Sequence, residues 1–257
     1  MNLELVLLGD PVEHSLSPAI HNAAIAASGL SGTYAARRVD EEGVVTAFAE
    51  LRSGRLSGLN VTMPHKVLAA KLCDRLDSDA ERAGSVNTVY MADGEVQGLS
   101  TDIGGIRDVW SAFPPSGPVL VIGAGGAAAA ACVALGDRAL YAAARRPGTV
   151  RDMATRLGLE PGVIGWGVPV VGAVVVNCTP LGMRGEELPE GVVALAGGIL
   201  DMAYGSGTTP AVEKLQKRGE PTVSGLDLLL AQAARSFSVW TGLPAPLKAM
   251  RAAVGNP

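Results

Sequence analysis

Short apolar runs alternate with amphipathic segments along the first part of the chain, and this alternation predicts an α/β unit. Residues 3–8 form a continuous apolar run that indicates a buried strand. The following segment gathers apolar residues on one helical face, at Ile20, Ala23, Ala24 and Ala27. Gly29 comes next, where glycine commonly ends a helix. Further strands are predicted at 33–39, 59–62, 86–91 and 95–99, and a hairpin turn at Asp93-Gly94 joins the last two. Helices are predicted at 18–28, at 41–52 and beyond Pro64.

A proline-rich segment, residues 114–118, separates this unit from a second one. After it come an apolar strand at 119–122, a glycine-rich turn, an alanine-rich helix and a strand at 139–144. This is the order of a parallel βαβ unit. Further strands are predicted near 173–177, 197–201 and 221–223, and two helices over 225–254 that separate near Gly242. The whole pattern predicts a two-domain α/β protein.

Composition narrows the class of protein without identifying it. Hydrophobic residues make up 48% of the 257 positions and charged residues 18%, so the chain can bury a substantial core. A net charge of −4 disfavours a protein that coats nucleic acid, and no apolar run reaches the roughly 18 residues of a membrane span. The three cysteines show no CxxC spacing, which disfavours a disulfide framework or a metal site and fits a reducing, cytoplasmic setting.

The glycine-rich turn fits the pattern G-x-G-x-x-A in the run Gly123-Ala124-Gly125-Gly126-Ala127-Ala128. The pattern alone is weak, but here it follows an apolar strand and opens a helix, as in a dinucleotide-binding (Rossmann) turn. Glycines let a pyrophosphate approach the backbone, and the helix N-terminus offers unpaired N–H groups to it. An ordinary glycine-rich helix start is the alternative.

The residues after the next strand predict which dinucleotide is bound. NAD sites usually place Asp or Glu about 20 residues beyond the glycines, whereas this chain has Arg145 and Arg146 there. Guanidinium groups pair well with a 2′-phosphate, so these arginines favour NADP over NAD. Two solvated arginines on a loop are the alternative.

Polar residues cluster at four points where a plain fold would not need them. Ser15 and Ser17 would lie on one face of extended chain beside a helix start, which suits a carboxylate. Ser17 is also a plausible N-cap, with Pro18 at the first helical position.

The other clusters follow strand ends. Asn60 and Thr62 alternate to one side of a strand end, and Lys66 lies in the next helical turn, where a cation opposes the helix dipole. Asn87 lies at the start of a strand. Asp102 ends another strand. It is a functional candidate, and the alternative is that it only caps the following helix.

Eight segments together resemble the shikimate dehydrogenase family. They are SLSPAIHN (15–22), NVTMPHK (60–66), GSVNTV (84–89), STD (100–102), GAGGAAAAA (123–131), NCTPLGM (177–183), DMAYGSGTTP (201–210) and SGLDLLLAQAARSFSVWTG (224–242). The segments keep the family's order and span nearly the whole chain. The NVTxPxK segment together with the late GLxxLLxQ segment is specific to the family.

The resemblance implies a substrate-binding domain of residues 1–102 plus 226–257, on which the C-terminal helices pack back, and a Rossmann-type NADP-binding domain of residues 103–225. It implies reversible, NADPH-dependent reduction of 3-dehydroshikimate to shikimate, a step toward chorismate and aromatic amino acids. A homodimer is compatible with it, and no metal, nucleic-acid or membrane partner is expected.

The same resemblance implies roles for individual residues. Lys66 and Asp102 are the catalytic pair. Substrate contacts are implied for Ser15, Ser17, Asn60, Thr62, Lys66, Asn87, Asp102, Tyr204 and Gln232. Cofactor contacts are implied for Gly123, Ala124, Gly125, Gly126, Ala127, Arg145, Arg146, Thr179, Met202 and Gly225.

Some positions depart from the family pattern and leave alternatives open. The family usually has Asn-Arg-Thr after the second Rossmann strand, where this chain reads Ala144-Arg145-Arg146. A quinate/shikimate or aminoshikimate dehydrogenase using NAD(P), or a non-catalytic dinucleotide-binding paralogue, would share the fold. Ser17 favours shikimate, because the NAD-linked quinate forms often carry Thr there.

Overall fold

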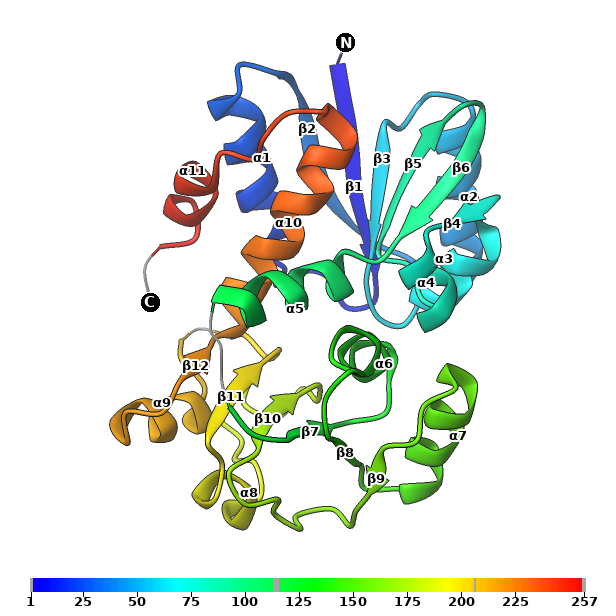
Figure 1. Cartoon of the computed structure of the whole chain (residues 1–257). Helices are drawn as coiled ribbons and strands as arrows, with labels where there is room; N and C mark the ends of the chain where they lie inside the picture. Colours follow the sequence, from blue (N-terminus) through cyan, green and yellow to red (C-terminus); the bar gives the residue numbers. More distant parts are fainter. Residues whose placement is uncertain (1, 113–115, 206, 256–257) are drawn as a thin grey trace. The chain divides into compact units, whose positions relative to one another are not determined.

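The computed structural model describes residues 2–112, 116–205 and 207–255. Two prolines of the proline-rich segment, at 114 and 115, lie outside the described residues. The chain forms two compact units, one of Met1–Gly104 with Leu230–Asn256 and one of Gly105–Leu229. Both units are α/β, and each contains one six-stranded sheet (Figure 1).

The first unit has a mixed sheet with the strand order β2-β1-β3-β5-β6-β4. Its strands are β1 (Asn2–Gly9), β2 (Ser31–Arg38), β3 (Gly58–Val61), β4 (Arg75–Leu76), β5 (Thr88–Ala92) and β6 (Glu95–Leu99). Only β5 runs antiparallel to its neighbours. The predicted turn between β5 and β6 is confirmed, with positive φ angles of 52° at Asp93 and 79° at Gly94.

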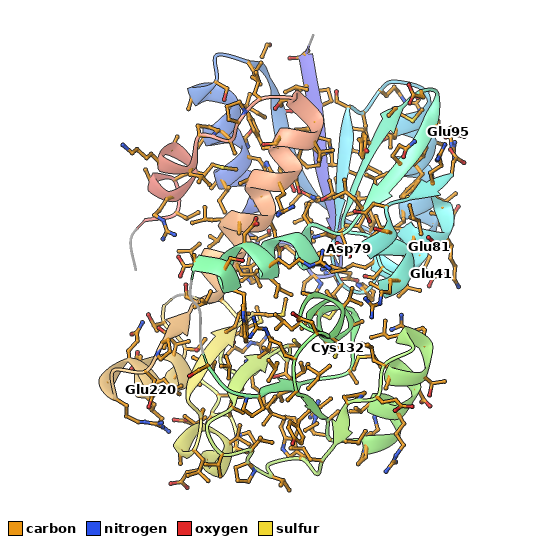
Figure 2. The ribbon with its side chains drawn as sticks, viewed as in Figure 1. Glu41, Asp79, Glu81, Glu95, Cys132 and Glu220 are labelled. Atoms are coloured by element: carbon orange, nitrogen blue, oxygen red, sulfur yellow. The ribbon has the colours of Figure 1, made fainter. Side chains whose placement is uncertain are left out.

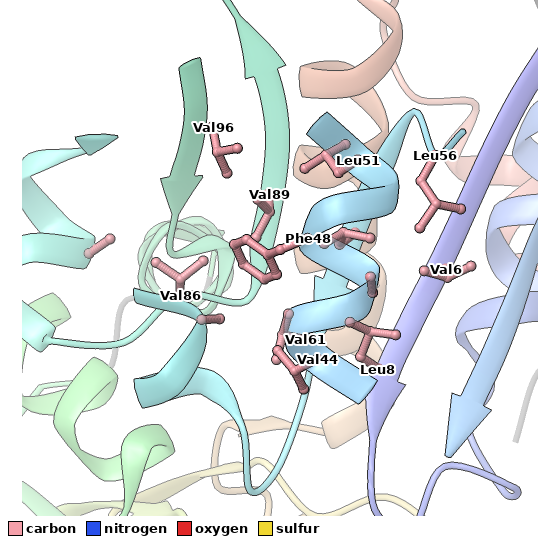
Figure 3. Close-up of a cluster of buried hydrophobic side chains, with 14 residues drawn as sticks. Val6, Leu8, Val44, Phe48, Leu51, Leu56, Val61, Val86, Val89 and Val96 are labelled. Carbon is pink, nitrogen blue, oxygen red and sulfur yellow. The ribbon is translucent and has the colours of Figure 1, made fainter. Parts of the chain in front are cut away.

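Helices cover both faces of this sheet (Figure 1). They are α1 (Ser17–Ala27), α2 (Glu41–Arg52), α3 (Lys66–Leu72), α4 (Ser78–Ala83), the first turn of α5 (Thr101–Ala112), most of α10 (Gly225–Thr241) and α11 (Leu247–Ala252). Figure 3 shows Val44, Phe48 and Leu51 of α2 packed against valines and leucines of the strands. On the opposite face Gly58 faces Trp240 of α10, and a Cβ at Gly58 would lie 2.3 Å from the Trp240 Nε1 atom. The packing of the C-terminal helices on the first unit is thereby confirmed.

The start of α1 differs from the sequence prediction. Leu16, not Ser17, occupies the N-cap position, and its helical φ and ψ angles show that the segment is not extended. Ser17 is already in the helix, and its backbone N–H donates to the Ser15 hydroxyl oxygen at 3.2 Å. The buried face is also rotated, because His21 is buried while Ala27 is exposed. Gly29 ends the helix with a φ of 65°, as predicted.

The second unit has an all-parallel sheet with the strand order β12-β11-β10-β7-β8-β9. Its strands are β7 (Val119–Ile122), β8 (Leu140–Ala143), β9 (Gly162–Val163), β10 (Val174–Asn177), β11 (Gly198–Asp201) and β12 (Thr222–Val223). In chain order within this unit, that is the 3-2-1-4-5-6 arrangement of dinucleotide-binding folds. The direction of winding reverses between β7 and β10, and ligands of such sheets bind at the carboxyl ends of the strands there.

The helices of the second unit are α6 (Gly126–Ala134), α7 (Pro147–Leu157), α8 (Glu190–Ala194) and α9 (Pro210–Lys217). Cys132 lies in α6 (Figure 2), where burial raises the pKa of its thiol to about 12 and keeps the thiol protonated. Within the described part of the chain, no helix combines the length and apolar character that crossing a membrane requires.

The sequence analysis missed two capped helices, α4 and α9. Asp77 accepts a hydrogen bond from the Ala80 N–H at the start of α4, and the Thr209 hydroxyl accepts one from Val212 at the start of α9. Both residues are standard N-caps and were available as signals. The two-residue strands β4 and β9 are too short for any periodic pattern to reveal.

Candidate active site

Most of the predicted substrate residues of the first unit lie at one edge of its sheet. Because β1, β3 and β6 are mutually parallel, their carboxyl ends share an edge, and the antiparallel β5 begins there. Residues 15–17 follow β1, residues 62–66 follow β3, Asn87 directly precedes β5, and Asp102 comes shortly after β6. The sheet order therefore brings together four sequence segments that are separate in the chain.

Lys66 and Asp102 form an ion pair at this edge. The Lys66 Nζ lies 2.5 Å from the Asp102 Oδ2, and the side chains are 19% and 3% exposed. Lys66 is the first residue of α3, as predicted. Asp102 is not a cap, because α5 begins at Thr101 and places Asp102 in the first helical turn. There its side chain lies near the helix N-terminus, a favourable position for a negative charge, and accepts a hydrogen bond from the ammonium group.

The Asn60 carboxamide is engaged by protein groups. Its Nδ2 donates to the Asn87 backbone oxygen at 2.8 Å and to the Thr88 hydroxyl at 2.9 Å, while its Oδ1 accepts from the Tyr34 hydroxyl at 2.7 Å. Asn60 therefore ties β3 to β2 and β5. Its predicted contact with a substrate stays a prediction.

Other polar groups at the edge remain available to a ligand. Among the described residues, no hydrogen-bond partner is present for the Ser17 hydroxyl, the Thr62 hydroxyl, the Asn87 Nδ2 or the Gln232 carboxamide. Thr62 is held in place by its own backbone, whose N–H donates to the Leu8 oxygen at 2.8 Å. These groups can donate or accept hydrogen bonds, as a polyhydroxylated carboxylate requires.

His21 of α1 is buried between Tyr34 and Trp240 and gives a testable pH dependence. Its ring is stacked on Tyr34 with 4.3 Å between centroids, and burial lowers its pKa to about 3. Between about pH 6.5 and 3 the unfolded chain binds this proton and the folded chain does not, so stability falls as the pH falls, by about 1.4 kcal/mol per pH unit.

We expect His21→Phe to flatten this dependence. Between pH 7 and pH 5, the wild-type free energy of unfolding should fall by about 2 kcal/mol more than that of the variant. Urea titrations of both proteins at the two pH values measure the difference. Parallel losses in the two proteins would show that His21 does not control this slope.

The glycine-rich turn of the second unit has the geometry of a phosphate-binding turn. Gly123 has a φ of 128°, and a Cβ there would lie 3.1 Å from the Cys178 backbone oxygen. Gly125 is the N-cap of α6, and a Cβ at Gly125 would meet no atom within 4 Å. The first glycine is thus needed by the protein itself. The second leaves open space at the N-terminus of α6, where unpaired backbone N–H groups can donate to a phosphate.

Arg145 and Arg146 follow β8 after one intervening residue, Ala144, and are exposed. Within the described residues, neither guanidinium group has a hydrogen-bond or ion-pair partner. Arg146 is the N-cap residue of α7, so the pair lies at the carboxyl edge of the sheet. The positions suit binding of a phosphate on an adenosine ribose.

A buried polar network joins the ends of β10 and β11 at the same edge. Asn177 donates to the Asp201 Oδ1 at 2.8 Å, and its own Oδ1 accepts from the Thr179 hydroxyl at 2.7 Å. Asp201 also accepts from the Thr209 hydroxyl at 2.6 Å. Burial raises the pKa of Asp201, while the hydrogen bonds it accepts oppose that rise. The network fixes the loops that begin with Thr179 and Met202, a role for Asn177 and Asp201 that sequence reasoning missed.

Gly225 and Tyr204 complete the predicted residues of the second unit. A Cβ at Gly225 would lie 2.4 Å from the Ala203 backbone oxygen, so glycine alone allows α10 to start beside the loop that carries Met202. Tyr204 is partly exposed in that loop. Their predicted contacts with substrate and cofactor stay predictions.

The strand order and the glycine turn of the second unit define a Rossmann-type dinucleotide-binding protein. The ammonium–carboxylate pair at the edge of the other sheet contains a group that can donate a proton and a group that can accept one. Comparison with known proteins then identifies the family. Residues 7–89 match the shikimate dehydrogenase substrate binding domain, and residues 225–254 match the shikimate 5′-dehydrogenase C-terminal domain.

Full-length relatives extend the match to nearly the whole chain. The chain is 40% identical to a shikimate dehydrogenase (NADP(+)) of Rubrobacter xylanophilus, over 97% of this chain and 94% of that one. It is 37% identical to a protein of the same name from Methanopyrus kandleri, over 96% and 93%. A crystal structure of shikimate 5-dehydrogenase from Thermus thermophilus in complex with NADP(H) and shikimate superimposes with a TM-score of 0.88, at 32% identity and 98% coverage of both chains. The chain belongs to the shikimate dehydrogenase family, which confirms the resemblance.

Proposed function

We propose that this protein catalyses the reversible, NADPH-dependent reduction of 3-dehydroshikimate to shikimate. The observation that carries the proposal is the buried Lys66–Asp102 ion pair at a sheet edge lined with free hydrogen-bonding groups. Relatives named shikimate dehydrogenase (NADP(+)) match over almost their full length, which supports both the substrate and the cofactor.

The chemistry needs a hydride on carbon and a proton on oxygen. NADPH, when bound, supplies the hydride. Lys66 donates the proton to the ketone oxygen in reduction and takes it back in oxidation. Its side chain is 19% exposed, so water can restore the proton after each turnover. Asp102 holds the ammonium group in position and stabilises its charge.

The residues around the substrate are suited to its polar groups. The Ser17 and Thr62 hydroxyls and the Asn87 and Gln232 carboxamides provide donors and acceptors for the carboxylate and hydroxyls of shikimate. Binding the substrate against this edge fixes the distance between the ketone and Lys66. Such positioning supplies several kcal/mol of barrier lowering in enzymes of this kind.

In the second unit, Gly123, Gly125 and the N-terminus of α6 hold the pyrophosphate of NADP, and Arg145 with Arg146 binds its 2′-phosphate. The open space at Gly125 and the exposed arginines support this assignment. The Asn177–Asp201 network keeps the loops of Thr179 and Met202 in place beside the cofactor.

One assay tests the proposal. We expect NADP to be reduced in the presence of shikimate, with a kcat/KM well above that for quinate or for NAD, measured by absorbance at the NADPH band. Preference for quinate with NAD would identify the protein as a quinate/shikimate dehydrogenase instead. Absence of turnover with either substrate would support a non-catalytic paralogue.

Two further features belong to the proposal. The protein acts in the reducing cytoplasm, which is supported by the free thiols of Cys73, Cys132 and Cys178. A homodimer stays a prediction, and light scattering of the purified protein measures it.

A further inference from the structure

Three buried hydroxyl groups form a cluster behind the candidate active site, inside the first unit. They belong to Thr88 of β5, Thr101 of α5 and Ser236 of α10, whose side chains are almost fully buried. The Thr88 Oγ1 lies 2.8 Å from the Ser236 Oγ and 3.2 Å from the Thr101 Oγ1. We call these three residues the hydroxyl cluster, and Figure 1 labels the elements that carry them.

The hydroxyl cluster contacts predicted substrate residues of β3 and α10, and its member Thr101 lies next to Asp102 in α5. Asn60 of β3 donates to the Thr88 Oγ1 at 2.9 Å and to the Ser236 Oγ at 3.2 Å. Ser236 also donates to the backbone oxygen of Gln232, one helical turn earlier, at 3.2 Å. Thr101 directly precedes Asp102. The cluster is therefore a junction between β3, β5, α5 and α10.

The cluster also decides which way the Asn87 carboxamide points. The Asn87 Oδ1 accepts from the Thr101 backbone N–H at 2.7 Å and from the Thr101 hydroxyl at 3.1 Å. With both bonds made to Oδ1, the carboxamide cannot flip without placing N–H groups against the Thr101 N–H donor. The Nδ2 group is left facing away from Thr101, without a partner among the described residues.

We propose that Thr88, Thr101 and Ser236 are positioning residues that make Asn87 a fixed hydrogen-bond donor beside Asp102, a fixed acceptor. The inference rests on the proposed function. Thr88 acts on Thr101 directly, because its hydroxyl can donate to the Thr101 Oγ1 at 3.2 Å and so leaves the Thr101 proton for Asn87. Ser236 acts through Thr88, whose Oγ1 it contacts at 2.8 Å. A substrate must then accept at the Asn87 Nδ2 and donate to the Asp102 carboxylate. This requirement is met by a hydroxyl group on one substrate carbon, which donates to Asp102, and a carbonyl or hydroxyl oxygen on the neighbouring carbon, which accepts from Asn87.

Paired substitutions test the role of the cluster. Ser236→Ala and Thr88→Val remove one hydroxyl each and keep the side-chain volume close to the original, whereas Thr88→Ser retains the Oγ atom. Ser238→Ala, on the same helix and partly exposed, is the matched control. We expect the KM for shikimate to rise by about five- to tenfold in the first two variants and to stay near wild type in the other two.

The binding of NADPH, followed by its fluorescence, should be unchanged in all four variants. A merely structural role would lower the melting temperature of Ser236→Ala but leave its KM for shikimate at the wild-type value, and that result would overturn the inference. If Thr88→Val does not fold, Ser236→Ala and Thr88→Ser still decide the comparison.

A double-mutant cycle adds a test whose expected result a change in folding stability alone would not produce. If Ser236 acts through Asn87, the effect of Ser236→Ala on KM should largely disappear in an Asn87→Ala background. Additive effects would contradict the inference.

The proposed function is tested separately, with the wild-type protein. If the wild type prefers quinate, the proposed function fails, and the same ratios measured with quinate still decide the role of the cluster.

Discussion

Lys66→Ala should lower kcat for shikimate oxidation by about two to four orders of magnitude, the usual contribution of a positioned acid–base group. The substitution removes the proton donor and leaves the Asp102 carboxylate, which is 3% exposed, without its ammonium partner. Steady-state kinetics with NADP and shikimate measure the loss. The affinity for NADPH, measured by fluorescence titration, should hardly change, because its predicted contacts belong to the other unit.

Lys71→Ala is the matched control for this experiment. Lys71 lies on the same helix, α3, but is exposed, so its removal should leave kcat near the wild-type value. Added ethylamine should restore part of the rate of Lys66→Ala, because a free ammonium ion can replace the missing proton donor. Normal turnover by Lys66→Ala would exclude Lys66 from the mechanism.

Replacing Arg145 and Arg146 together by alanine should weaken NADPH binding by about 10- to 100-fold and leave NADH binding within about threefold. Each charge-assisted hydrogen bond to the 2′-phosphate contributes about 1.5–3 kcal/mol, less where solvent screens it, and NADH lacks that phosphate. Dissociation constants for both cofactors, measured by fluorescence, give the selectivity directly. The arginines are exposed, so the fold should tolerate both changes.

Arg151→Ala controls for the general loss of positive charge. Arg151 is exposed on α7, the helix that follows the arginine pair. Its removal should affect the two cofactors equally and weakly, because it is not at the strand end. If the double variant lost equal affinity for NADPH and NADH, the arginines would not bind the 2′-phosphate of NADPH.

Local patterns in the sequence predicted most of the elements correctly. Asp93-Gly94 predicted the turn of the hairpin, and the apolar run at 119–122 followed by glycines predicted β7 and the start of α6. These signals are reliable because a turn or a helix start depends on the φ preferences and hydrogen bonds of neighbouring residues. The same reasoning failed for the α1 face, because alanine suits either side of a helix and His21 is buried by stacking on Tyr34.

The candidate residues were named from the sequence, but their roles were not equally visible there. Ser17 and Asp102 were plausible caps by residue type, yet the structure places both inside the first turns of their helices. Ser236 carried no signal, because a serine within an amphipathic helix is ordinarily a solvated residue. Its burial against Thr88 became visible only when α10 was packed on the sheet.

The sequence by itself determined most of the strands, turns and helices, the glycine turn that suits a dinucleotide, and the arginines shortly after β8, because each depends on neighbours in the chain. Only the tertiary structure decided which polar groups meet. Lys66 and Asp102 are 36 positions apart, and Thr88 and Ser236 are 148 apart. Sheet order and helix packing bring such groups together, and hydrogen-bond direction then fixes how each is presented, neither of which follows from linear spacing.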